Sequence, residues 1–413
     1  MRIAVIGGGI SGMASAWLLS RRHAVDLYEA NAYIGGHTHT HDVASGGRDY
    51  AVDSGFIVFN PDNYPLLSRL FGELGVDAQP TTMSFAVHNE ASGLEYGATS
   101  LDALFCQRLN LLSPKFYGMV RDIVRFYRES PALLQTADAG PTLGDYLERH
   151  RYGAMFRDEH IVPMASALWS SPSRKVLDFP ARYLVQFMAN HHMLQLDGRP
   201  EWRVVRGGST RYVDALRARW NVRERIASPV TAVRRSEDGV EITSLGQTER
   251  YDQVVLACHS NEALALLADA TPAEREVLGA IRYQENDTVL HTDTRLLPKR
   301  RKAWSAWNVL IPASPTEACT VTYCMNLLQS LDAPDTFCVS LNCSDRIDPA
   351  KVIQRMRYAH PEYTHASVAA QQRKGEIQGR SGTWFAGAYW GWGFHEDGMR
   401  SAVEVARALG VDW

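Results

Sequence analysis

The most informative segment of this 413-residue chain is Ile3-Ala4-Val5-Ile6-Gly7-Gly8-Gly9-Ile10-Ser11-Gly12. Four apolar residues predict a buried parallel strand, and Gly7-x-Gly9-x-x-Gly12 predicts the turn after it. A helix over residues 13–21 and a strand over residues 24–28 complete a βαβ unit. In such a unit the first glycine makes a tight turn, the second lets the backbone approach a pyrophosphate, and the third lets the helix pack closely on the strand. We therefore expect a dinucleotide at this turn.

An acidic residue follows at the position that this type of site requires. Glu29 ends the second predicted strand, where a carboxylate accepts hydrogen bonds from an adenosine ribose. The N-terminus of the intervening helix offers free amides and a positive dipole to the phosphates. The negative charge of Glu29 would repel a 2′-phosphate. This unit alone does not separate NAD from FAD.

A second glycine-rich turn lies near the other end of the sequence. A strand over residues 383–388 is followed by Gly391-Trp392-Gly393-Phe394-His395-Glu396-Asp397-Gly398 and then by a helix to Leu409. The N-terminal end of such a helix would stabilise the negative charge that a reduced flavin carries. Two strand-to-helix turns, one near each end of the chain, favour one long cofactor between them. FAD fits that span better than NAD.

Composition excludes several classes of function. The chain has 43 Lys and Arg against 46 Asp and Glu, so no strong positive field is available for nucleic acid. Its six cysteines form no Cys-x-x-Cys pair, which favours free thiols in a reducing compartment. A core strand starts at Arg2, and no run of about 18 apolar residues occurs. These features predict a cytoplasmic protein whose contact with a membrane, if it has one, is peripheral.

The order of strands and helices predicts two domains that are both discontinuous. An α/β, Rossmann-like FAD-binding domain is expected from residues 1–80, 203–270 and 379–413, because the apolar strand at residues 251–258 has the character of a central parallel strand. An inserted α+β substrate domain with a mixed sheet and a helical part is expected from residues 81–202 and 271–378.

Histidines are the main candidates for chemistry outside the glycine turns. His37, His39 and His41 alternate along a predicted strand and share one face. They resemble a metal cluster, but no acidic or sulfur ligand accompanies them, so we predict no metal site. His191 and His192 point about 100° apart on a helix; a packing role and a substrate contact both stay open for them. The candidate catalytic residues are His192 and His291.

These motifs together resemble the flavin-containing amine oxidase superfamily, which includes monoamine oxidases, protoporphyrinogen oxidase and phytoene desaturases. Four further runs are similar to the N-terminal flavoprotein domain of plant cyclopropane-fatty-acid synthases and to its stand-alone bacterial relatives. These runs are Asn190 to Gln195, Gly198 to Trp202, Ala303 to Asn308 and Gly393 to Gly398.

The resemblance implies an FAD site and assigns its contacts residue by residue. The implied contacts are Gly7, Gly9, Ile10, Ser11 and Gly12 at the pyrophosphate, Glu29 and Ala30 at the ribose, and Val230 at the adenine. At the flavin they are Gly35, Gly36, His37, Gly55, Phe56, Ile57, Gly387, Phe394, His395, Glu396 and Gly398.

Two departures from the superfamily pattern narrow the expected chemistry. Residues 283–298 contain no lysine, although amine oxidases of this superfamily often place one near flavin N5. Residues 379–413 contain no cysteine of the kind that monoamine oxidases link to the flavin. Non-covalent FAD is therefore expected, and amine oxidation is less favoured.

The first functional hypothesis is an FAD-dependent oxidoreductase that desaturates or dehydrogenates an apolar substrate such as a fatty acyl chain. Aromatic residues would wall its channel, unless they only fill the core; they are Trp169, Trp202, Trp304, Trp307, Trp384, Tyr389, Trp390 and Trp392. The alternatives are an amine oxidase, a redox-neutral lipid isomerase, and an FAD-bound partner of a lipid methyltransferase. The expected partner is a small molecule or a lipid, and the sequence predicts no oligomeric state.

Overall fold

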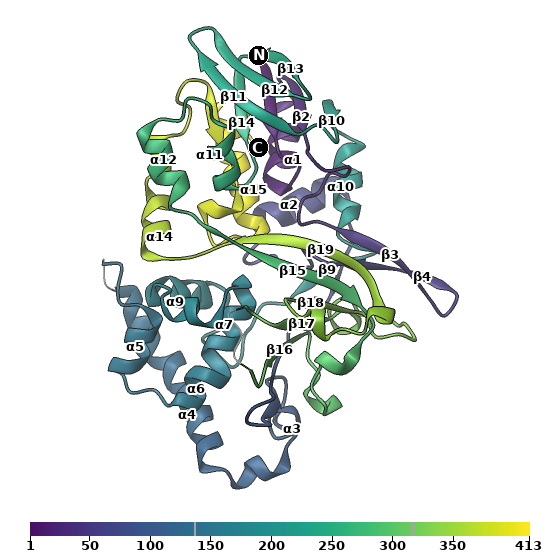
Figure 1. Ribbon diagram of the computed structural model, residues 1–413, viewed down its shortest axis with the longest axis vertical. Coiled ribbons are helices and arrows are strands. Elements are labelled where there is room, and N and C mark those ends of the chain that lie inside the picture. The colour runs from purple at the N-terminus through teal and green to yellow at the C-terminus, as the bar shows by residue number, and fades with distance from the viewer. Residues whose placement is uncertain (136–137, 315–317) are drawn as a thin grey trace.

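The computed structural model describes residues 1–135, 138–314 and 318–413. A five-stranded parallel sheet forms one half of the molecule (Figure 1). Its strand order is β10-β2-β1-β14-β20. These strands are β1 (Arg2–Ile6), β2 (Ala24–Tyr28), β10 (Val222–Arg225), β14 (Gln253–Leu256) and β20 (Thr383–Phe385). The central strand β1 pairs with β2 on one side and β14 on the other. The returning strand predicted at residues 251–258 therefore completes the sheet.

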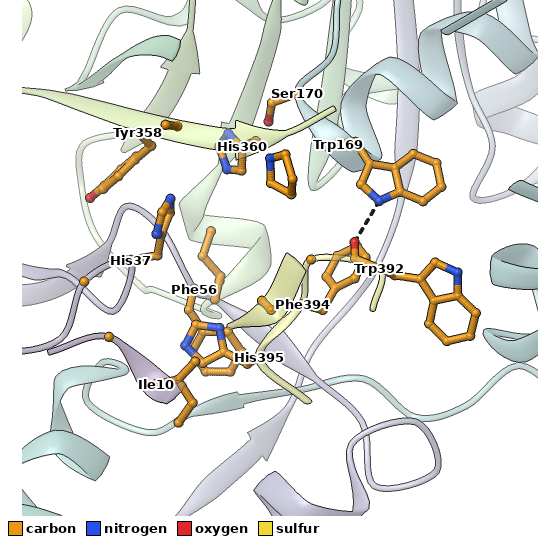
Figure 2. A pocket seen from close by; sticks show the side chains of 18 of the residues that line it. Ile10, His37, Phe56, Trp169, Ser170, Tyr358, His360, Trp392, Phe394 and His395 are labelled. Carbon is orange, nitrogen blue, oxygen red and sulfur yellow. Dashed lines mark hydrogen bonds between the residues drawn. The ribbon is translucent and has the colours of Figure 1, made fainter. Parts of the chain in front are cut away.

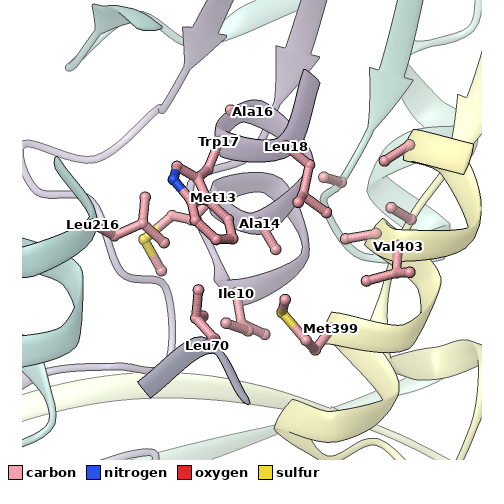
Figure 3. Close-up of a cluster of buried hydrophobic side chains, with 14 of the residues drawn as sticks. Ile10, Met13, Ala14, Ala16, Trp17, Leu18, Leu70, Leu216, Met399 and Val403 are labelled. Carbon is pink, nitrogen blue, oxygen red and sulfur yellow. The ribbon is translucent and has the colours of Figure 1, made fainter. Parts of the chain in front are cut away.

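One face of this sheet is covered by helices from distant parts of the sequence. They are α1 (Ile10–Leu19), α2 (Pro65–Leu74), α10 (Thr210–Arg217) and α15 (His395–Ala408). Every residue of α1 is buried. Figure 3 shows Met13 and Ala14 of α1 among Leu70, Leu216 and Met399, which come from the other three helices. Burying apolar side chains on all sides fixes α1 at the centre of this half.

The opposite face carries an antiparallel sheet and two short helices. The sheet consists of β11 (Val230–Ser236), β12 (Gly239–Ser244) and β13 (Gln247–Tyr251). The helices are α11 (Ser260–Leu266) and α12 (Pro272–Gly279). Their apolar residues pack with Ala4 and Val254 from the parallel sheet.

A seven-stranded mixed sheet forms the second half, in the order β19-β15-β18-β17-β16-β7-β8. Its strands are β7 (Phe85–Asn89), β8 (Glu95–Gly97), β15 (Tyr283–His291), β16 (Trp307–Ile311), β17 (Val321–Cys324), β18 (Cys338–Leu341) and β19 (Val352–Pro361). It is mixed because β7 pairs parallel with β16, whereas the other pairs are antiparallel. The long strands β15 and β19 cross between the two halves (Figure 1).

Helices pack beside this sheet and form the outer end of the second half (Figure 1). They are α3 (Leu101–Leu104), α4 (Pro114–Glu129), α5 (Leu143–Arg149), α6 (Ala154–Phe156), α7 (Val162–Trp169), α8 (Ser173–Leu177) and α9 (Ala181–Asn190). The small helices α13 (Met325–Leu328) and α14 (His365–Gln372) lie in the later segment. Within the described residues, none of the helices has the length and apolar character needed to cross a membrane.

Short strands join the two halves. The hairpin of β3 (Thr40–Ser45) and β4 (Arg48–Asp53) and the sheet of β5 (Val58–Phe59), β9 (Arg203–Val205) and β6 (Ala78–Pro80) lie at the boundary. Val43 and Val52 of the hairpin pack with Leu290 and Phe337 of the second half. The strands of the parallel sheet all fall within residues 1–80, 203–270 and 379–413, and those of the mixed sheet fall within 81–202 and 271–378.

Candidate functional site

A cavity of about 1260 Å³ runs between the two halves, from the first glycine turn to the apolar interior of the second half. Both glycine-rich turns contribute to its wall. Of the predicted cofactor contacts, the following line it: Gly7, Gly9, Ile10, Ser11, Glu29, Ala30, Gly36, His37, Gly55, Phe56, Ile57, Val230, Gly387, Phe394 and His395. The fold thus brings residues from both ends of the sequence to one continuous space.

The first turn is closely packed on its protein side and open on its cavity side. Gly7 has φ +105°, and a Cβ there would lie 2.7 Å from the Ala257 carbonyl oxygen. A Cβ on Gly9 would meet nothing within 4 Å. Gly9 is also the N-cap of α1, so the positive end of the helix dipole faces this opening. A pyrophosphate fits this cradle.

Glu29 is held rigidly at the end of β2. One carboxylate oxygen accepts a hydrogen bond from the Gly8 amide at 2.8 Å, and the other accepts from the Asn31 amide at 2.7 Å and its side chain at 2.9 Å. The side chain is buried but still lines the cavity. This fixed acceptor suits a ribose hydroxyl pair at the predicted position.

At the other end of the cofactor cradle, the last helix meets the segment around Phe56. His395, the first residue of α15, stacks on Phe56 with ring centroids 3.7 Å apart (Figure 2). Its Nε2 lies 3.0 Å from the Thr38 hydroxyl. Burial lowers the pKa of His37 to about 4, so its imidazole is uncharged at neutral pH. His37 Nε2 is buried without a hydrogen-bond partner among the described residues, which leaves a polar atom for a bound group.

Four predicted contacts do not reach the cavity and serve the protein frame instead. Glu396 accepts hydrogen bonds from the Leu66 and Leu67 amides at 3.1 and 3.0 Å, so it caps α2. A Cβ on Gly398 would lie 2.8 Å from Ile10 Cγ2, and one on Gly12 would lie 1.8 Å from the Gly7 carbonyl oxygen. Gly35 donates its amide to the Gly8 carbonyl at 2.9 Å. These residues shape the cradle without lining it.

The two candidate catalytic histidines also lie outside the cavity wall. His291 is fully buried in β15, between the Ser340 hydroxyl at 2.8 Å and the Asp293 amide at 3.0 Å. His192 is exposed just beyond the end of α9, with φ +54°. Its neighbour His191 is buried and lines the cavity. Neither His192 nor His291 is placed to touch a molecule in the cavity.

Other histidines, His37, His259 and His360, line the cavity. Of these three, the sequence had singled out only His37. His37 lies among His259, His360 and Tyr358, with ring centroids 5.9, 5.4 and 4.9 Å away. Asn286 on β15 lies 3.1 Å from His360 Nδ1 on β19. Tyr358 and His360 are two residues apart and share a strand face (Figure 2). The alternation of Tyr358 and His360 along a strand was the signal in the sequence that could have identified them, but no strand was predicted over residues 352–361. In the described part of the chain, no group of three or more His, Cys, Asp or Glu is suited to hold a metal ion.

Beyond the histidines the wall becomes apolar and aromatic. This part is lined by Met83, Phe85, Met164, Leu168, Trp169, Phe187, Trp307, Tyr323, Leu328 and Leu341. Of the predicted aromatic wall, Trp169, Trp202, Trp307, Tyr389 and Trp392 line the cavity, whereas Trp304, Trp384 and Trp390 do not. Trp169 Nε1 donates to the Trp392 carbonyl at 3.0 Å and joins α7 to the second glycine turn (Figure 2). Arg199, Tyr127 and His160 also line this part.

Comparisons with known proteins agree with this geometry. A family model described as flavin containing amine oxidoreductase matches residues 10–291. A carotenoid phi-ring synthase of Chlorobaculum tepidum is 29% identical over 158 residues, which are 37% of this chain and 22% of that protein. The chain thus spans less than a quarter of the length of that relative.

Two solved structures share the fold over nearly the whole chain. The CLA-producing fatty acid isomerase from P. acnes has a TM-score of 0.65 at 17% identity, with 99% of each chain covered. Cyclohexylamine oxidase from Brevibacterium oxydans IH-35A has a TM-score of 0.66 at 18% identity, with 99% of this chain and 98% of that chain covered. The predicted fold class, a discontinuous Rossmann-like domain with an inserted mixed sheet and helical domain, is confirmed.

Proposed function

Because the chain belongs to the flavin-containing amine oxidoreductase family and is a flavin-dependent oxidoreductase, we propose that it uses non-covalent FAD to desaturate or dehydrogenate a fatty acyl chain. Bound FAD would supply a two-electron acceptor, taking a hydride at its N5 atom. We propose an acyl chain as the substrate because the part of the cavity beyond the histidines is apolar and aromatic.

FAD is supported by the two ends of the cradle. The Gly7–Gly9 turn and Glu29 suit a pyrophosphate and a ribose, and Phe56, Phe394 and His395 line the same cavity beside the second glycine-rich turn. A dinucleotide that carries a planar three-ring system would contact both of these groups of residues. Non-covalent binding is supported by the absence of cysteine from residues 379–413.

An acyl chain is supported over an amine by the side chains that face the cavity. Within the described part of the chain, its wall contains no lysine and no aspartate, and β15 supplies no lysine to the cofactor region. The wall does contain four glutamates: Glu29 is the residue assigned to the ribose, and Glu201, Glu262 and Glu285 are exposed to solvent. Methionine, leucine and aromatic side chains offer favourable contact to methylene groups at each point of the apolar part. Arg199 provides a cation in the wall that suits an acidic head group.

The residues around the cofactor region would position the reacting carbons and keep water out. Formation of a double bond removes a hydride from one carbon and a proton from its neighbour. His37 is uncharged and has an unpartnered Nε2 atom, so it is a candidate to take that proton. The Trp169–Trp392 hydrogen bond closes the wall between the two halves, and a dry site needs no charged base to help the C–H bond break.

Anaerobic incubation of the purified flavoprotein with a panel of acyl lipids and amines tests this proposal, with the flavin absorbance as the readout. We expect acyl lipids to bleach the flavin and amines to leave it oxidised. Trp307→Ala, which alters the cavity wall, should slow bleaching, whereas Trp304→Ala, which lies outside the wall, should not. Bleaching by amines alone would show an amine oxidase. Conversion of a lipid with no net bleaching and no oxygen use would show an isomerase. Inertness toward every compound would favour the FAD-bound partner of a lipid methyltransferase.

A further inference from the structure

The segment from α3 to α4 lies at the helical end of the molecule, farthest from the parallel sheet (Figure 1). Large apolar side chains are exposed on this segment. Leu109 and Leu112 are each 82% exposed and Leu101 is 76% exposed. Single exposed leucines are ordinary, but a group of them marks an interaction site. We name this region, residues 100–129 and 298–302, the docking tip.

Contacts within the docking tip show that its parts form one surface. Tyr117 on α4 donates its hydroxyl to the Leu111 carbonyl at 3.2 Å, and its ring lies 5.9 Å from that of Phe105. Lys302 from the second segment pairs with Asp102 of α3 at 2.9 Å. The exposed leucines on the α3-to-α4 connection are therefore fixed beside α4 and beside the Lys299–Lys302 segment.

Helix α4 presents a mixed aromatic, aliphatic and basic face to solvent. Tyr117, Arg121, Val124 and Arg128 are all exposed, and their spacing of four, three and four residues places them on one side of the helix. The opposite side buries Phe116, Met119 and Phe126. An apolar centre flanked by arginines is the pattern of helices that lie in a membrane interface, where long basic side chains reach up to the head groups.

The docking tip has a charge opposite to that of the whole chain. It contains nine basic residues and three acidic ones, whereas the net charge of the chain is −3. The basic residues are Arg108, Lys115, Arg121, Arg125, Arg128, Lys299, Arg300, Arg301 and Lys302, and the acidic ones are Asp102, Asp122 and Glu129. Each acid is already paired with a base of the tip, and Arg300 is paired with Glu95, which lies outside the tip. Positive charge still remains in excess on the other bases.

We propose that the docking tip binds the surface of an anionic lipid bilayer, with Leu101, Leu109 and Leu112 inserted between head groups and the arginines of α4 at the level of the phosphates. Protruding leucines surrounded by excess positive charge complement such a surface in both its apolar and its anionic layer. Helix α4 also contributes Tyr127 to the cavity wall, so one helix links the bilayer to the space proposed for an acyl chain. The docking itself does not depend on the proposed substrate.

Co-sedimentation of the FAD-loaded protein with vesicles tests this proposal. We expect binding to vesicles of phosphatidylglycerol and phosphatidylcholine, and at least about tenfold weaker binding to phosphatidylcholine alone or at about 0.5 M salt. The double variant Leu109→Ser/Leu112→Ser should weaken binding to the anionic vesicles about tenfold or more. Arg121→Glu/Arg128→Glu should abolish the preference for anionic lipid. All four side chains are exposed, and FAD content and melting temperature verify that the variants fold.

Leu245→Ser is the matched control, because Leu245 is 69% exposed in the turn between β12 and β13, at the other end of the molecule. It should bind vesicles like the unaltered protein. Equal losses in Leu245→Ser and in the double leucine variant would overturn the proposal, and so would binding that ignores lipid charge. Self-association without vesicle binding, abolished by the double leucine variant, would instead assign this face to a second copy of the chain. Flavin bleaching by a short soluble substrate is independent of docking, so the two proposals can fail separately.

Discussion

Trp169 Nε1 donates a hydrogen bond to the Trp392 carbonyl oxygen at 3.0 Å and thereby joins the helical half to the glycine turn that precedes α15. Tyr183 strengthens the same junction, since its hydroxyl donates to the Gly391 carbonyl at 2.8 Å. Both donors come from the inserted domain and both acceptors from one loop beside the cofactor region. The relative position of the two halves is therefore fixed directly at the site.

Replacing Trp169 by phenylalanine should slow flavin reduction while FAD stays bound. The variant keeps an apolar ring in the wall but loses the indole donor, which costs about 0.5–1.5 kcal/mol and admits water. Stopped-flow reduction by the best substrate of the panel measures the effect. Trp304→Phe, outside the cavity, is the control. Equal reduction rates in the two variants would mean that the junction does not govern access to the flavin.

Gly12→Ala should prevent formation of the cofactor site. Its Cβ would lie 1.8 Å from the Gly7 carbonyl oxygen, so α1 or the turn must move. We expect loss of FAD that excess FAD does not restore, together with a lower melting temperature. Gly72→Ala in α2 is matched to it, since a Cβ there meets nothing within 4 Å; it should raise stability by about 0.5–1 kcal/mol. A Gly12→Ala protein with normal FAD content would show that the turn is not closely packed.

Glu29→Gln should weaken FAD binding without removing the site. In the unaltered protein the Gly8 amide and the Asn31 donors surround two acceptor oxygens. The glutamine side chain keeps one acceptor oxygen, but its NH₂ group faces the Gly8 amide or the Asn31 donors. A loss of about 1–3 kcal/mol makes the protein release FAD on dilution and recover it when FAD is added in excess. Fluorescence titration of the released flavin gives the dissociation constant. Failure of excess FAD to rescue binding would place Glu29 in the frame rather than at the ribose.

His291 should make the protein less stable as the pH falls. Burial lowers the pKa of its imidazole to about 4, whereas an unfolded histidine has a pKa of about 6.5. At a pH between these two values, His291 therefore binds a proton in the unfolded chain but not in the folded protein. The resulting loss of stability begins near pH 6.5 and continues to about pH 4, at up to about 1.4 kcal/mol per pH unit.

Denaturant unfolding of His291→Asn over this range measures the contribution. The variant should start less stable at pH 7.5 but should depend less steeply on pH than the unaltered protein. Leu245→Ser, which changes an exposed residue that has no ionisable group, should leave the slope unchanged. An unchanged slope in His291→Asn would mean that His291 is already protonated in the folded protein.

Local motifs selected several residues that the fold brings to the cavity wall. The first βαβ unit and the turn before α15 each bring their glycines together within a few residues. Sequence spacing selected Gly7 and Gly9, and the family resemblance selected His395; all three line the cavity. Glu396 shows the limit of that reasoning. It lies inside a predicted motif, but its carboxylate caps α2, which is 330 residues away along the chain. Only the packing of α15 against α2 determines that role.

Long-range strand pairing determines the other part of the site, around His360. His360 reaches the cavity because β19 pairs with β15, with Asn286 opposite Tyr358 in the register. No periodicity within residues 352–361 specifies that partner, since pairing register depends on the faces that both strands bury. The sequence suggested His291 and His192 as catalytic residues; both are histidines, but both lie outside the cavity wall. Five of the eight aromatic residues named for the wall line the cavity. The sequence does not distinguish Trp169, which lines it, from Trp304, which does not, because the difference depends on their neighbours in the fold.

The order of the parallel sheet has a consequence for biosynthesis. Strand β1 is translated long before its neighbour β14, which begins at Gln253, and before α15, which packs against α1 and begins at His395. A ribosome making this chain has therefore exposed the Gly7–Gly12 turn long before the residues that enclose it exist. Because every residue of α1 is buried in the folded protein, the nascent helix must stay sheltered by other chain segments or by chaperones during that interval. The cradle that α1 and α15 form together is therefore complete only after α15 has been translated.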